Sequence, residues 1–465
     1  MSALSPARAA ALACLMEAAE RGRYVREVLD ASARVAALDP RDAGLARRLA
    51  LGATAARGCL DELLDRALTR PQRVSPRVRM ALRISAFELL YLGTPAQVAV
   101  SQGVELVRSV AAGAAGLANA VLRRVAEGSA AYLAAADVPG AGRELVAAAR
   151  GAGLPRWLLE ELEVSLAPAQ REALLACELE PAPVAVHANP GAMARGAAAV
   201  PGEAGALPGC ILSPDVASLA RAGAFERAEV VASDENAQLV ATAATRSGSC
   251  LEVGAGRGTK TFVMAAQARR AGFERRHVAL DVSAGKLAAN AARLERAGLG
   301  GASFAPGDAR DLDAALAAID TAAGRRVRFD TVLVDAPCSG TGTMRRHPEI
   351  PWRLTREEAC AELPALQLEL LQQAAGRVAP GGELFYATCS VLAGENEGVL
   401  SAFLASEQGS AFEPVPLSGA AIFALPAFSA AGEAVRRCEG PSDRFQSCPA
   451  PGRPDGHFCA RLRRL

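Results

Sequence analysis

The sequence predicts a multidomain protein: an all-helical bundle, a small α+β subdomain, and then an α/β domain with a doubly wound parallel sheet. Two patterns predict this arrangement. Apolar residues recur at helical spacing near the start, and no strand-like alternation occurs before about residue 180. From residue 249, short apolar runs alternate with helical segments. Because 465 residues are too many for one core, we expect three parts, over residues 1–135, 136–240 and 241–465.

Helix start signals repeat through the first 135 residues. Ser5-Pro6, Asp39-Pro40, Ser75-Pro76 and Thr94-Pro95 each place a capping side chain before a first-turn proline. The same region holds 18 Arg and no Lys against 12 Asp and Glu, although the whole chain has a net charge of only +1. This basic balance favours an anionic partner such as RNA, and a solvated arginine-rich face is the alternative.

The totals favour a cytoplasmic protein. Eleven cysteines occur singly, with no Cys-x-x-Cys, which is typical of a reducing compartment. The uncharged stretch Pro414–Gly432 contains three prolines, so we expect a folded loop and not a membrane helix. We expect no metal site, because zinc-type spacing is absent from Cys438, Cys448, His457 and Cys459. The arginines of the last five residues, Arg461, Arg463 and Arg464, are predicted to form a solvated tail.

The α/β part is predicted from strands that alternate with helices. The expected strands cover residues 250–253, 277–280, 303–305, 331–334 and 383–387, and the expected helices cover 261–271 and 284–297. An earlier strand is expected over 181–188, and Leu154–Trp157 is expected to begin a helix before it. In open α/β sheets ligands bind beyond the carboxyl ends of the strands, so the residues that follow these strands are the candidate site residues.

A glycine-rich loop, Gly254–Thr259, follows the first of these strands and opens a helix. Its spacing is Gly-x-Gly-x-Gly, not the Gly-x-Gly-x-x-Gly that fits a pyrophosphate, and a merely tight turn would also explain it. Three acids lie at strand ends: Glu252, Asp281 and Asp308. Solvated surface acids are the alternative, but carboxylates beside such a loop favour a cationic, phosphate-free adenosine cofactor. S-adenosylmethionine fits that description.

Two cysteines follow strands, one in Asp335–Gly342 and the other in Thr388-Cys389-Ser390. A single cysteine at a strand end is most often a small buried apolar residue. Two at one sheet edge, one after Asp-Ala-Pro, favour a thiol pair facing one pocket. Carbon 5 of cytosine is a poor nucleophile, so its methylation requires a thiolate at carbon 6, an acid near the ring nitrogen and a base for the carbon 5 proton. Cys338, Cys389 and Asp335 supply one candidate for each of these three roles.

These motifs resemble the RNA cytosine-C5 methyltransferase family. Asp335–Trp352 and Tyr386–Ser390 carry the resemblance, and Glu395–Glu397 and Asp455–Phe458 match further family landmarks. The resemblance implies a class I, Rossmann-like methyltransferase domain in which Cys389 is the nucleophile, Cys338 assists product release and Asp335 contacts the target base. With the glycine loop, it predicts a cofactor site made of Glu252, Gly254, Ala255, Gly256, Gly258, Lys260, Asp281, Asp308 and Asp335.

The front of the chain resembles the NusB-like RNA-binding domain, through Pro95–Val107, Leu117–Arg124 and Gly52–Leu64. A NusB-like front on this catalytic part is similar to the bacterial RsmB (Sun/Fmu) type, which methylates 16S ribosomal RNA. The resemblance implies an RNA partner and neither DNA nor membrane, and a monomer is favoured. Arg345 and Arg346 could clamp the RNA backbone, with an exposed charged turn as the alternative.

Three departures from the family pattern leave the target RNA open. The glycine loop lacks the family's proline and paired glycines, His187 stands where the family has a substrate-facing arginine, and Ser233–Ala237 replaces Gln-Asp-Glu-Ala-Ser. Transfer RNA and 23S ribosomal RNA are therefore alternative substrates. A DNA methyltransferase would have no use for Cys389, and the glycine spacing disfavours a dehydrogenase. An RNA-binding module with a catalytically silent second half stays an alternative; a missing cysteine or strand-end acid would favour it, and none is missing.

Overall fold

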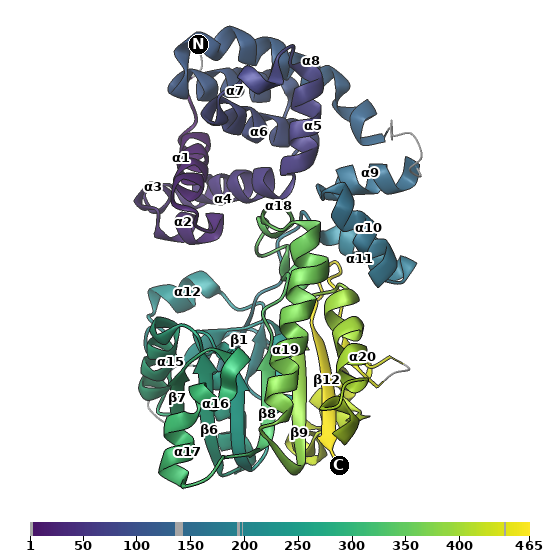
Figure 1. The fold of residues 1–465 in the computed structure, drawn as a ribbon. Helices are drawn as coiled ribbons and strands as arrows, with labels where there is room; N and C mark the ends of the chain where they lie inside the picture. Colours follow the sequence, from purple (N-terminus) through teal and green to yellow (C-terminus); the bar gives the residue numbers. More distant parts are fainter. Residues whose placement is uncertain (1–2, 135–142, 193–195, 198, 441–442) are drawn as a thin grey trace. The chain divides into compact units, whose positions relative to one another are not determined.

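The computed structural model describes residues 3–134, 143–192, 196–197, 199–440 and 443–465 (Figure 1). The chain forms two compact units. The first contains Met1–Pro181 and the second contains Ala182–Thr343 and Arg356–Leu465. The short segment Met344–Thr355 leaves the second unit and belongs to the first. The first unit therefore includes a piece of the chain that lies, in sequence, within the α/β part.

The described part of the first unit is helical, as predicted. Its α-helices are α1 (Pro6–Arg21), α2 (Val25–Ala31), α3 (Ala33–Ala36), α4 (Pro40–Ala55), α5 (Arg57–Ala67), α6 (Pro76–Tyr91), α7 (Ala96–Val110), α8 (Ala115–Ala134), α9 (Arg143–Ala152), α10 (Arg156–Ser165), α11 (Pro168–Cys177) and α18 (Ile350–Arg353). Prolines open α1, α4 and α6, and the Asp39 and Ser75 side chains accept bonds from first-turn amides of α4 and α6. The fourth expected helix, α7, begins one residue later than predicted, because its N-cap is Pro95 and not Thr94.

Close helix packing in this unit requires small residues. A Cβ atom at Gly52 in α4 would lie 2.0 Å from the ring of Phe87 in α6, so only glycine lets the two helices approach. The segment 344–355 also packs closely against the helices of this unit, through Trp352 and Arg353. A Cβ atom at Gly58 would lie 2.3 Å from the Trp352 ring, and the Trp352 indole N–H donates to the Ala55 carbonyl at 2.9 Å. The Arg353 guanidinium lies 4.9 Å from the ring centroid of Tyr24.

The second unit begins with a small antiparallel sheet in the order β2-β3-β1-β4. Its strands are β1 (Ala185–Ala188), β2 (Glu203–Ala204), β3 (Cys210–Leu212) and β4 (Val230–Ala232). The strand expected over 181–188 is thus shorter than predicted, because β1 begins only at Ala185. In the first unit, the helix predicted to begin at Leu154–Trp157 is α10, which begins at Arg156.

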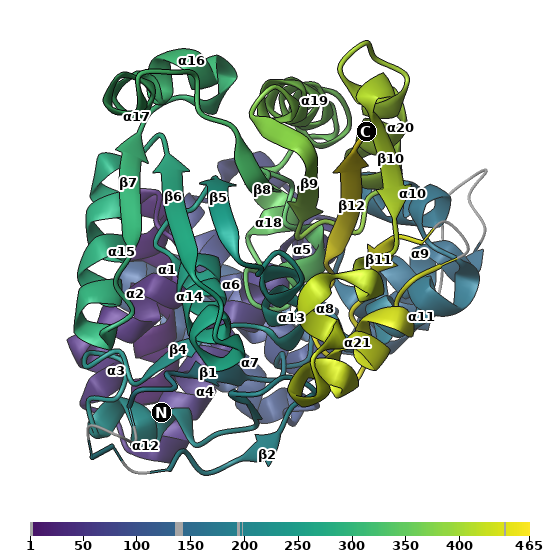
Figure 2. The same cartoon turned by 90° about the horizontal axis from the view of Figure 1, so that it is seen from below.

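The main sheet has the order β10-β12-β9-β8-β5-β6-β7, and β11 pairs with β12 (Figure 2). Its strands are β5 (Gly248–Val253), β6 (Arg275–Asp281), β7 (Ala302–Pro306), β8 (Phe329–Asp335), β9 (Val378–Thr388), β10 (Phe412–Val415), β11 (Phe445–Gln446) and β12 (Phe458–Arg464). Pairing from β7 to β9 is parallel, whereas β12 is antiparallel to both β9 and β10. The predicted doubly wound sheet is confirmed, with one antiparallel strand near its edge.

Helices cover both faces of this sheet. They are α13 (Glu235–Ala243), α14 (Thr259–Ala271), α15 (Ala284–Ala297), α16 (Leu312–Ala315), α17 (Ala317–Ala323), α19 (Leu363–Ala375), α20 (Val399–Leu404) and α21 (Ser429–Arg436). A further helix, α12 (Val216–Arg221), packs on the small sheet through Leu219. Val332 and Val334 of β8 pack in the core shared with α19 and α20, whereas Leu333 packs in the core shared with α13, α14 and α21. Because alternate strand residues point to opposite faces, a strand covered on both faces is continuously apolar.

The predicted solvated tail is wrong for Arg461 and for the segment's structure, although Arg463 is exposed. Residues 458–464 form β12, inside the sheet, and Arg461 is only 5% exposed. The Arg461 guanidinium bonds both carboxylate oxygens of Glu383, a diagonal neighbour on β9. A buried arginine of this kind cannot be told from a surface one by composition, since its partner lies far away in sequence.

The stretch 414–432 is folded, as expected. It contributes the end of β10, three short 3-10 turns and the start of α21. Among the residues described, the chain contains no helix with the length and apolar character needed to cross a bilayer.

We predict that Arg461→Ala lowers the free energy of unfolding of the second unit by about 3 kcal/mol, because it leaves the Glu383 carboxylate buried without its main partner. The matched control is Arg463→Ala in the same strand. Arg463 and Glu413 are each 48% exposed and 3.7 Å apart, so the loss should stay below about 1 kcal/mol. Urea unfolding followed by circular dichroism measures both, and equal losses would contradict the prediction.

Candidate active site

The parallel pairing of β8 with β9 brings the two predicted cysteines together. The Ala336 amide, just past β8, donates to the Ala387 carbonyl in β9 at 2.9 Å. Beyond these residues the two loops run side by side, and the Cys338 and Cys389 sulfur atoms lie 3.3 Å apart. The Cys389 backbone amide also points at the Cys338 sulfur, at 3.3 Å. The expected thiol pair is therefore a direct contact between free cysteines.

The two thiols have opposite pKa shifts. A hydrogen bond from Cys338 lowers the pKa of Cys389, against the effect of burial, and the positive charge of Lys260 lowers it further. The same hydrogen bond, together with burial, raises the pKa of Cys338 well above that of an ordinary thiol. The arrangement therefore favours a thiolate at Cys389 and a protonated thiol at Cys338.

A lysine–aspartate pair lies beside the thiols. Lys260 Nζ, at the start of α14, is 2.8 Å from Asp335 Oδ2, at the end of β8. Burial opposes the charge of Lys260, but Asp335 more than compensates, so the pKa of Lys260 is raised and the ammonium group stays charged. The Asp335 side chain is 27% exposed, so one face of this carboxylate is open to a ligand.

A buried carboxylate, Glu395, fastens the two cysteine loops to each other. It accepts hydrogen bonds from the Ser339 amide at 2.8 Å, from the Gln367 side chain at 2.9 Å, and from the hydroxyls of Ser339 and Ser390. Ser339 and Ser390 directly follow Cys338 and Cys389 in sequence. Glu395 is fully buried, so this network positions the sulfur atoms without itself facing a ligand. The sequence signal for it was only the Glu-Asn-Glu landmark.

The glycine loop is shaped by close backbone contacts. Gly254 has φ +79°, and a Cβ atom there would lie 2.3 Å from the Asp335 carbonyl oxygen. Gly256 has φ +53° and open space, with nothing closer than 3.9 Å to a Cβ position. The Asp281 carboxylate accepts bonds from the Gly256 amide at 2.9 Å and the Ser283 amide at 2.8 Å. Asp281 therefore holds the loop with the Gly256 side open to a ligand.

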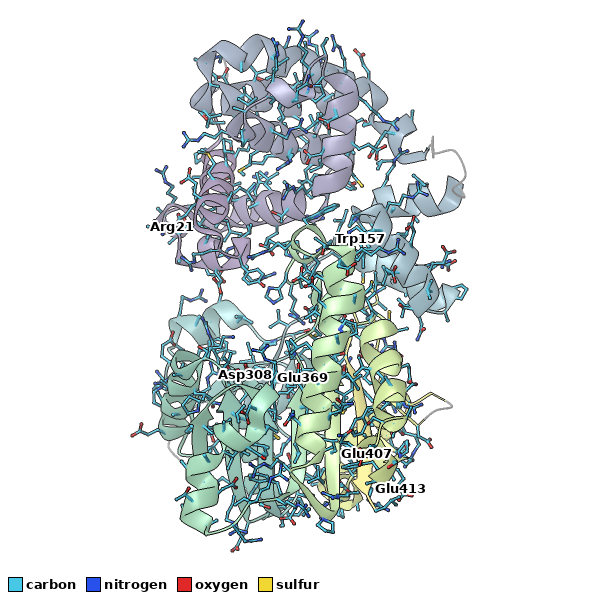
Figure 3. The ribbon with its side chains drawn as sticks, in the orientation of Figure 1. Arg21, Trp157, Asp308, Glu369, Glu407 and Glu413 are labelled. Atoms are coloured by element: carbon cyan, nitrogen blue, oxygen red, sulfur yellow. The ribbon has the colours of Figure 1, made fainter. Side chains whose placement is uncertain are left out.

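The other two strand-end acids are placed differently from each other. Glu252 is fully buried, accepts a hydrogen bond from Thr261 at 2.7 Å and lies 3.0 Å from His277 Nε2, so it supports the loop from behind. The Asp308 side chain, labelled in Figure 3, lies beyond β7 and is 44% exposed. It pairs with Arg310. Val282, directly after Asp281, is 75% exposed. Sequence reasoning missed this apolar side chain, although its place after a strand-end acid could have indicated it.

Of the two arginines expected to clamp RNA, Arg345 does not fit that role, whereas the half-buried Arg346 stays a prediction. Arg345 is 7% exposed and belongs to the first unit, so it does not fit an exposed phosphate clamp. Arg346 accepts a hydrogen bond from Arg26 on its carbonyl oxygen at 3.1 Å. His187 is fully buried and bonded to Gln238 and Arg270, and burial, aided by Arg270, lowers its pKa to about 3. It is a neutral core histidine, not a substrate-facing residue.

The open side of the site fits an adenosine cofactor. The exposed Val282 offers an apolar surface for a base, and the partly exposed carboxylates of Asp308 and Asp335 offer acceptors and negative charge for hydroxyls and a cationic centre. The loop backbone can approach a ligand closely at Gly256. Sheet order, glycine loop and acids together define an S-adenosylmethionine-dependent methyltransferase.

Comparison with known proteins narrows this class. Residues 240–463 match the family "16S rRNA methyltransferase RsmB/F", and residues 5–127 match the NusB family. The chain is 33% identical to ribosomal RNA small subunit methyltransferase B of Thermus thermophilus, over 88% of this chain and 89% of that protein. It is 31% identical to a candidate methyltransferase of Mycobacterium tuberculosis, Rv1407, over 99% of this chain and 97% of that protein. The solved structure of PH0851 superposes with a TM-score of 0.72 over 99% of both chains; at 19% identity this shows the fold alone.

The chain therefore belongs to the RsmB/F family of 16S rRNA methyltransferases and carries a NusB domain at its front. It is an S-adenosylmethionine-dependent RNA methyltransferase that acts on ribosomal RNA. The predictions of family, fold class and methyl donor are confirmed.

We predict that Asp281→Ala weakens S-adenosylmethionine binding about tenfold, because two loop amides lose the acceptor that orients them. Isothermal titration calorimetry measures the affinity. The control is Glu369→Ala, which removes an exposed carboxylate from α19 (Figure 3) and should leave the affinity unchanged. A similar loss in both variants would show a general charge effect instead.

Proposed function

We propose that this protein methylates carbon 5 of a cytidine in 16S ribosomal RNA, with Cys389 as the nucleophile and Cys338 assisting product release. The observation that carries the proposal is the 3.3 Å contact between two thiols whose pKa values are shifted in opposite directions. A DNA-type mechanism uses one cysteine and would not explain the second.

The first step forms a bond between the Cys389 thiolate and carbon 6 of the cytosine ring, and the ring electrons move toward carbon 5. The lowered pKa of Cys389 supplies the thiolate. We assign contact with the ring nitrogen side to Asp335, whose other face is held by Lys260. The cofactor, held by the glycine loop with Lys260, Asp281 and Asp308, supplies the methyl group that carbon 5 receives, while the buried Glu252 supports the loop from behind.

Release requires removal of the carbon 5 proton, and we assign this to Cys338. The first cause of its raised pKa is the hydrogen bond to Cys389. Once Cys389 is a thioether, it carries no negative charge, so Cys338 becomes easier to ionise. The thiolate of Cys338 then takes the proton, the electrons of the C–H bond form the 5,6 double bond, and the bond to Cys389 breaks to restore its thiolate.

The 16S target is supported by the family match and by relatives named as small subunit methyltransferases. We assign RNA binding to residues 1–135, which carry the excess of arginine and of which residues 5–127 match the NusB family. Residues 136–240 form the linker helices and substrate-side subdomain in this scheme, and residues 241–465 perform the chemistry. Labelling of transfer RNA or 23S RNA, and not 16S RNA, would keep the chemistry and reject the target.

We predict that Cys389→Ala gives neither methylated RNA nor a covalent adduct, whereas Cys338→Ala accumulates a denaturation-resistant protein–RNA adduct. The reason is that the first variant cannot form the bond to carbon 6 and the second cannot break it. Tritiated S-adenosylmethionine with unmodified 16S RNA, followed by denaturing electrophoresis, measures both. An adduct in Cys389→Ala but not in Cys338→Ala would reverse the assignment of the two cysteines.

The pH dependence of kcat/KM for RNA tests the thiolate. Activity should rise with pH through the pKa of Cys389 and level off below the range of ordinary thiols, because that pKa is lowered. Lys260→Met removes a charge that favours the thiolate, so the rising limb should move to higher pH by about one unit. Lys286→Met, at an exposed position on α15, is the control and should not move it. A limb that stays in place in Lys260→Met would contradict the thiolate assignment.

A further inference from the structure

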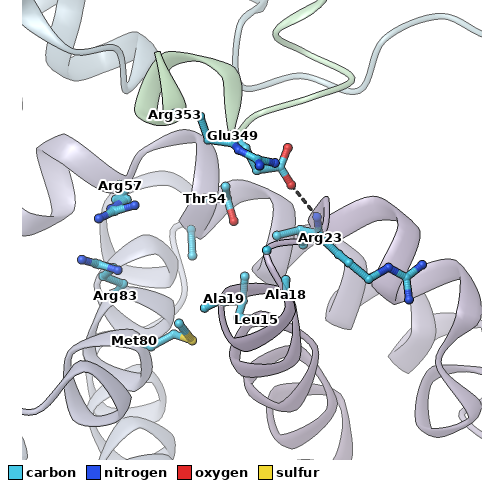
Figure 4. Close-up of a pocket in the computed structure, with 13 residues that line it drawn as sticks. Leu15, Ala18, Ala19, Arg23, Thr54, Arg57, Met80, Arg83, Glu349 and Arg353 are labelled. Carbon is cyan, nitrogen blue, oxygen red and sulfur yellow. Dashed lines mark hydrogen bonds between the residues drawn. The ribbon is translucent and has the colours of Figure 1, made fainter. Parts of the chain in front are cut away.

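The first unit contains a pocket of about 240 Å³ between α1, α4, α6 and the 344–355 segment (Figure 4). One part of its lining is apolar, made of Leu15, Ala18, Ala19, Val25 and Met80. Another part is strongly basic, made of Arg23, Arg57, Arg83 and Arg353. A pocket with an apolar part and several guanidinium groups matches a ligand that has both a flat apolar face and negative charge.

Two of these arginines, Arg83 and Arg353, are held in place, and Arg57 and Arg353 are accessible. The Arg57 side chain is 49% exposed, and partial burial, followed by the nearby charge of Arg83, lowers its pKa. Arg83 is fixed by two bonds of 2.7 Å to Asp61. Arg353 is stacked over Tyr24. Positioned guanidinium groups are suited to phosphate oxygens, since little side-chain freedom is lost on binding.

A second feature of the pocket is a buried carboxylate oxygen that lacks a hydrogen-bond donor among the described residues. Glu349 lines it and is only 7% exposed. One carboxylate oxygen accepts the Val25 backbone amide, as the dashed line in Figure 4 shows, but Oε2 is buried without a hydrogen-bond partner among the described residues. A buried acceptor without a donor is costly, so a ligand that brings an N–H group there would gain stability.

We propose that this pocket binds one unpaired nucleotide of the RNA substrate, with the base on the apolar lining, a base N–H donating to Glu349, and the neighbouring phosphate on Arg57 and Arg353. Unstacked bases of this kind are what proteins recognise in single-stranded RNA. The inference rests on the RNA substrate of the proposed function and adds where a nucleotide is held. Glu349 belongs to the stretch that follows the Cys338 loop in sequence, so RNA contact and chemistry share one run of chain.

The test is equilibrium binding of a fluorescein-labelled, unmodified 16S RNA fragment to the full chain, followed by fluorescence anisotropy. Arg57→Gln should weaken binding about fivefold or more and lower the salt dependence by about one ion, as expected for a lost phosphate contact. The matched control is Arg41→Gln, an exposed arginine outside the pocket, which should change affinity less than twofold. Ala19→Trp fills the pocket from an exposed helix position without changing charge, and should weaken binding as Arg57→Gln does.

Three results would overturn the proposal. Equal losses in Arg57→Gln and Arg41→Gln would mean that general charge, and not the pocket, binds RNA. A loss in Arg57→Gln without one in Ala19→Trp would mean that no base enters the pocket. Unchanged RNA binding in both pocket variants would mean that the pocket does not bind RNA and would favour a protein ligand instead. Because binding is measured without methyl transfer, failure of the cysteine mechanism would not affect these outcomes. In turnover assays the pocket variants should raise KM and leave kcat unchanged.

Discussion

The active site depends on one structural constraint, the parallel pairing of β8 with β9. That pairing aligns the ends of two strands, and the loops that follow place two sulfur atoms 3.3 Å apart. At this distance the two thiols share one proton more readily than they keep two, so their acidities must diverge. The opposite pKa shifts of Cys389 and Cys338 thus arise from a contact that exists before any substrate binds.

Such a contact needs support, because sulfur atoms in loops could otherwise move apart. Glu395 provides it by bonding both residues that follow the cysteines, while Gln367 and the buried Tyr386 complete the network from α19 and β9. Lys260 supplies the nearby positive charge, and its own charge is kept by Asp335. The result is a site in which the supporting groups are buried and the two thiols are partly open, an arrangement that suits preorganised catalysis.

The 344–355 segment follows the Cys338 loop in sequence but belongs to the first unit. Trp352 and Glu349 bond to the backbone of Ala55 and Val25, so the stretch just beyond the cysteine loop is built into the helical unit. RNA held by that unit would therefore contact the same run of chain that carries Cys338. This offers a physical reason for joining a NusB domain to a methyltransferase in one protein.

Sequence alone was enough for the fold class, for the methyl donor and for the two cysteines that the structure brings together. Apolar periodicity, proline-capped helix starts and the alternation of strands with helices depend on neighbours within a few residues, so they can be read locally. The two cysteines, Asp335 and the glycine loop were found because strand ends meet at one sheet edge, a rule that needs no coordinates.

Only the tertiary structure decided which polar groups are buried and what they bond. Arg461 looked like a solvated tail and Arg345 like an exposed clamp, yet both are buried, Arg461 against Glu383, far away in the chain. His187 became a core residue, and Glu252 turned to the back of the loop. The direction of each cysteine's pKa also needed the 3.3 Å contact and the place of Lys260. These properties depend on contacts between residues distant in sequence, and composition or spacing carries no record of such contacts.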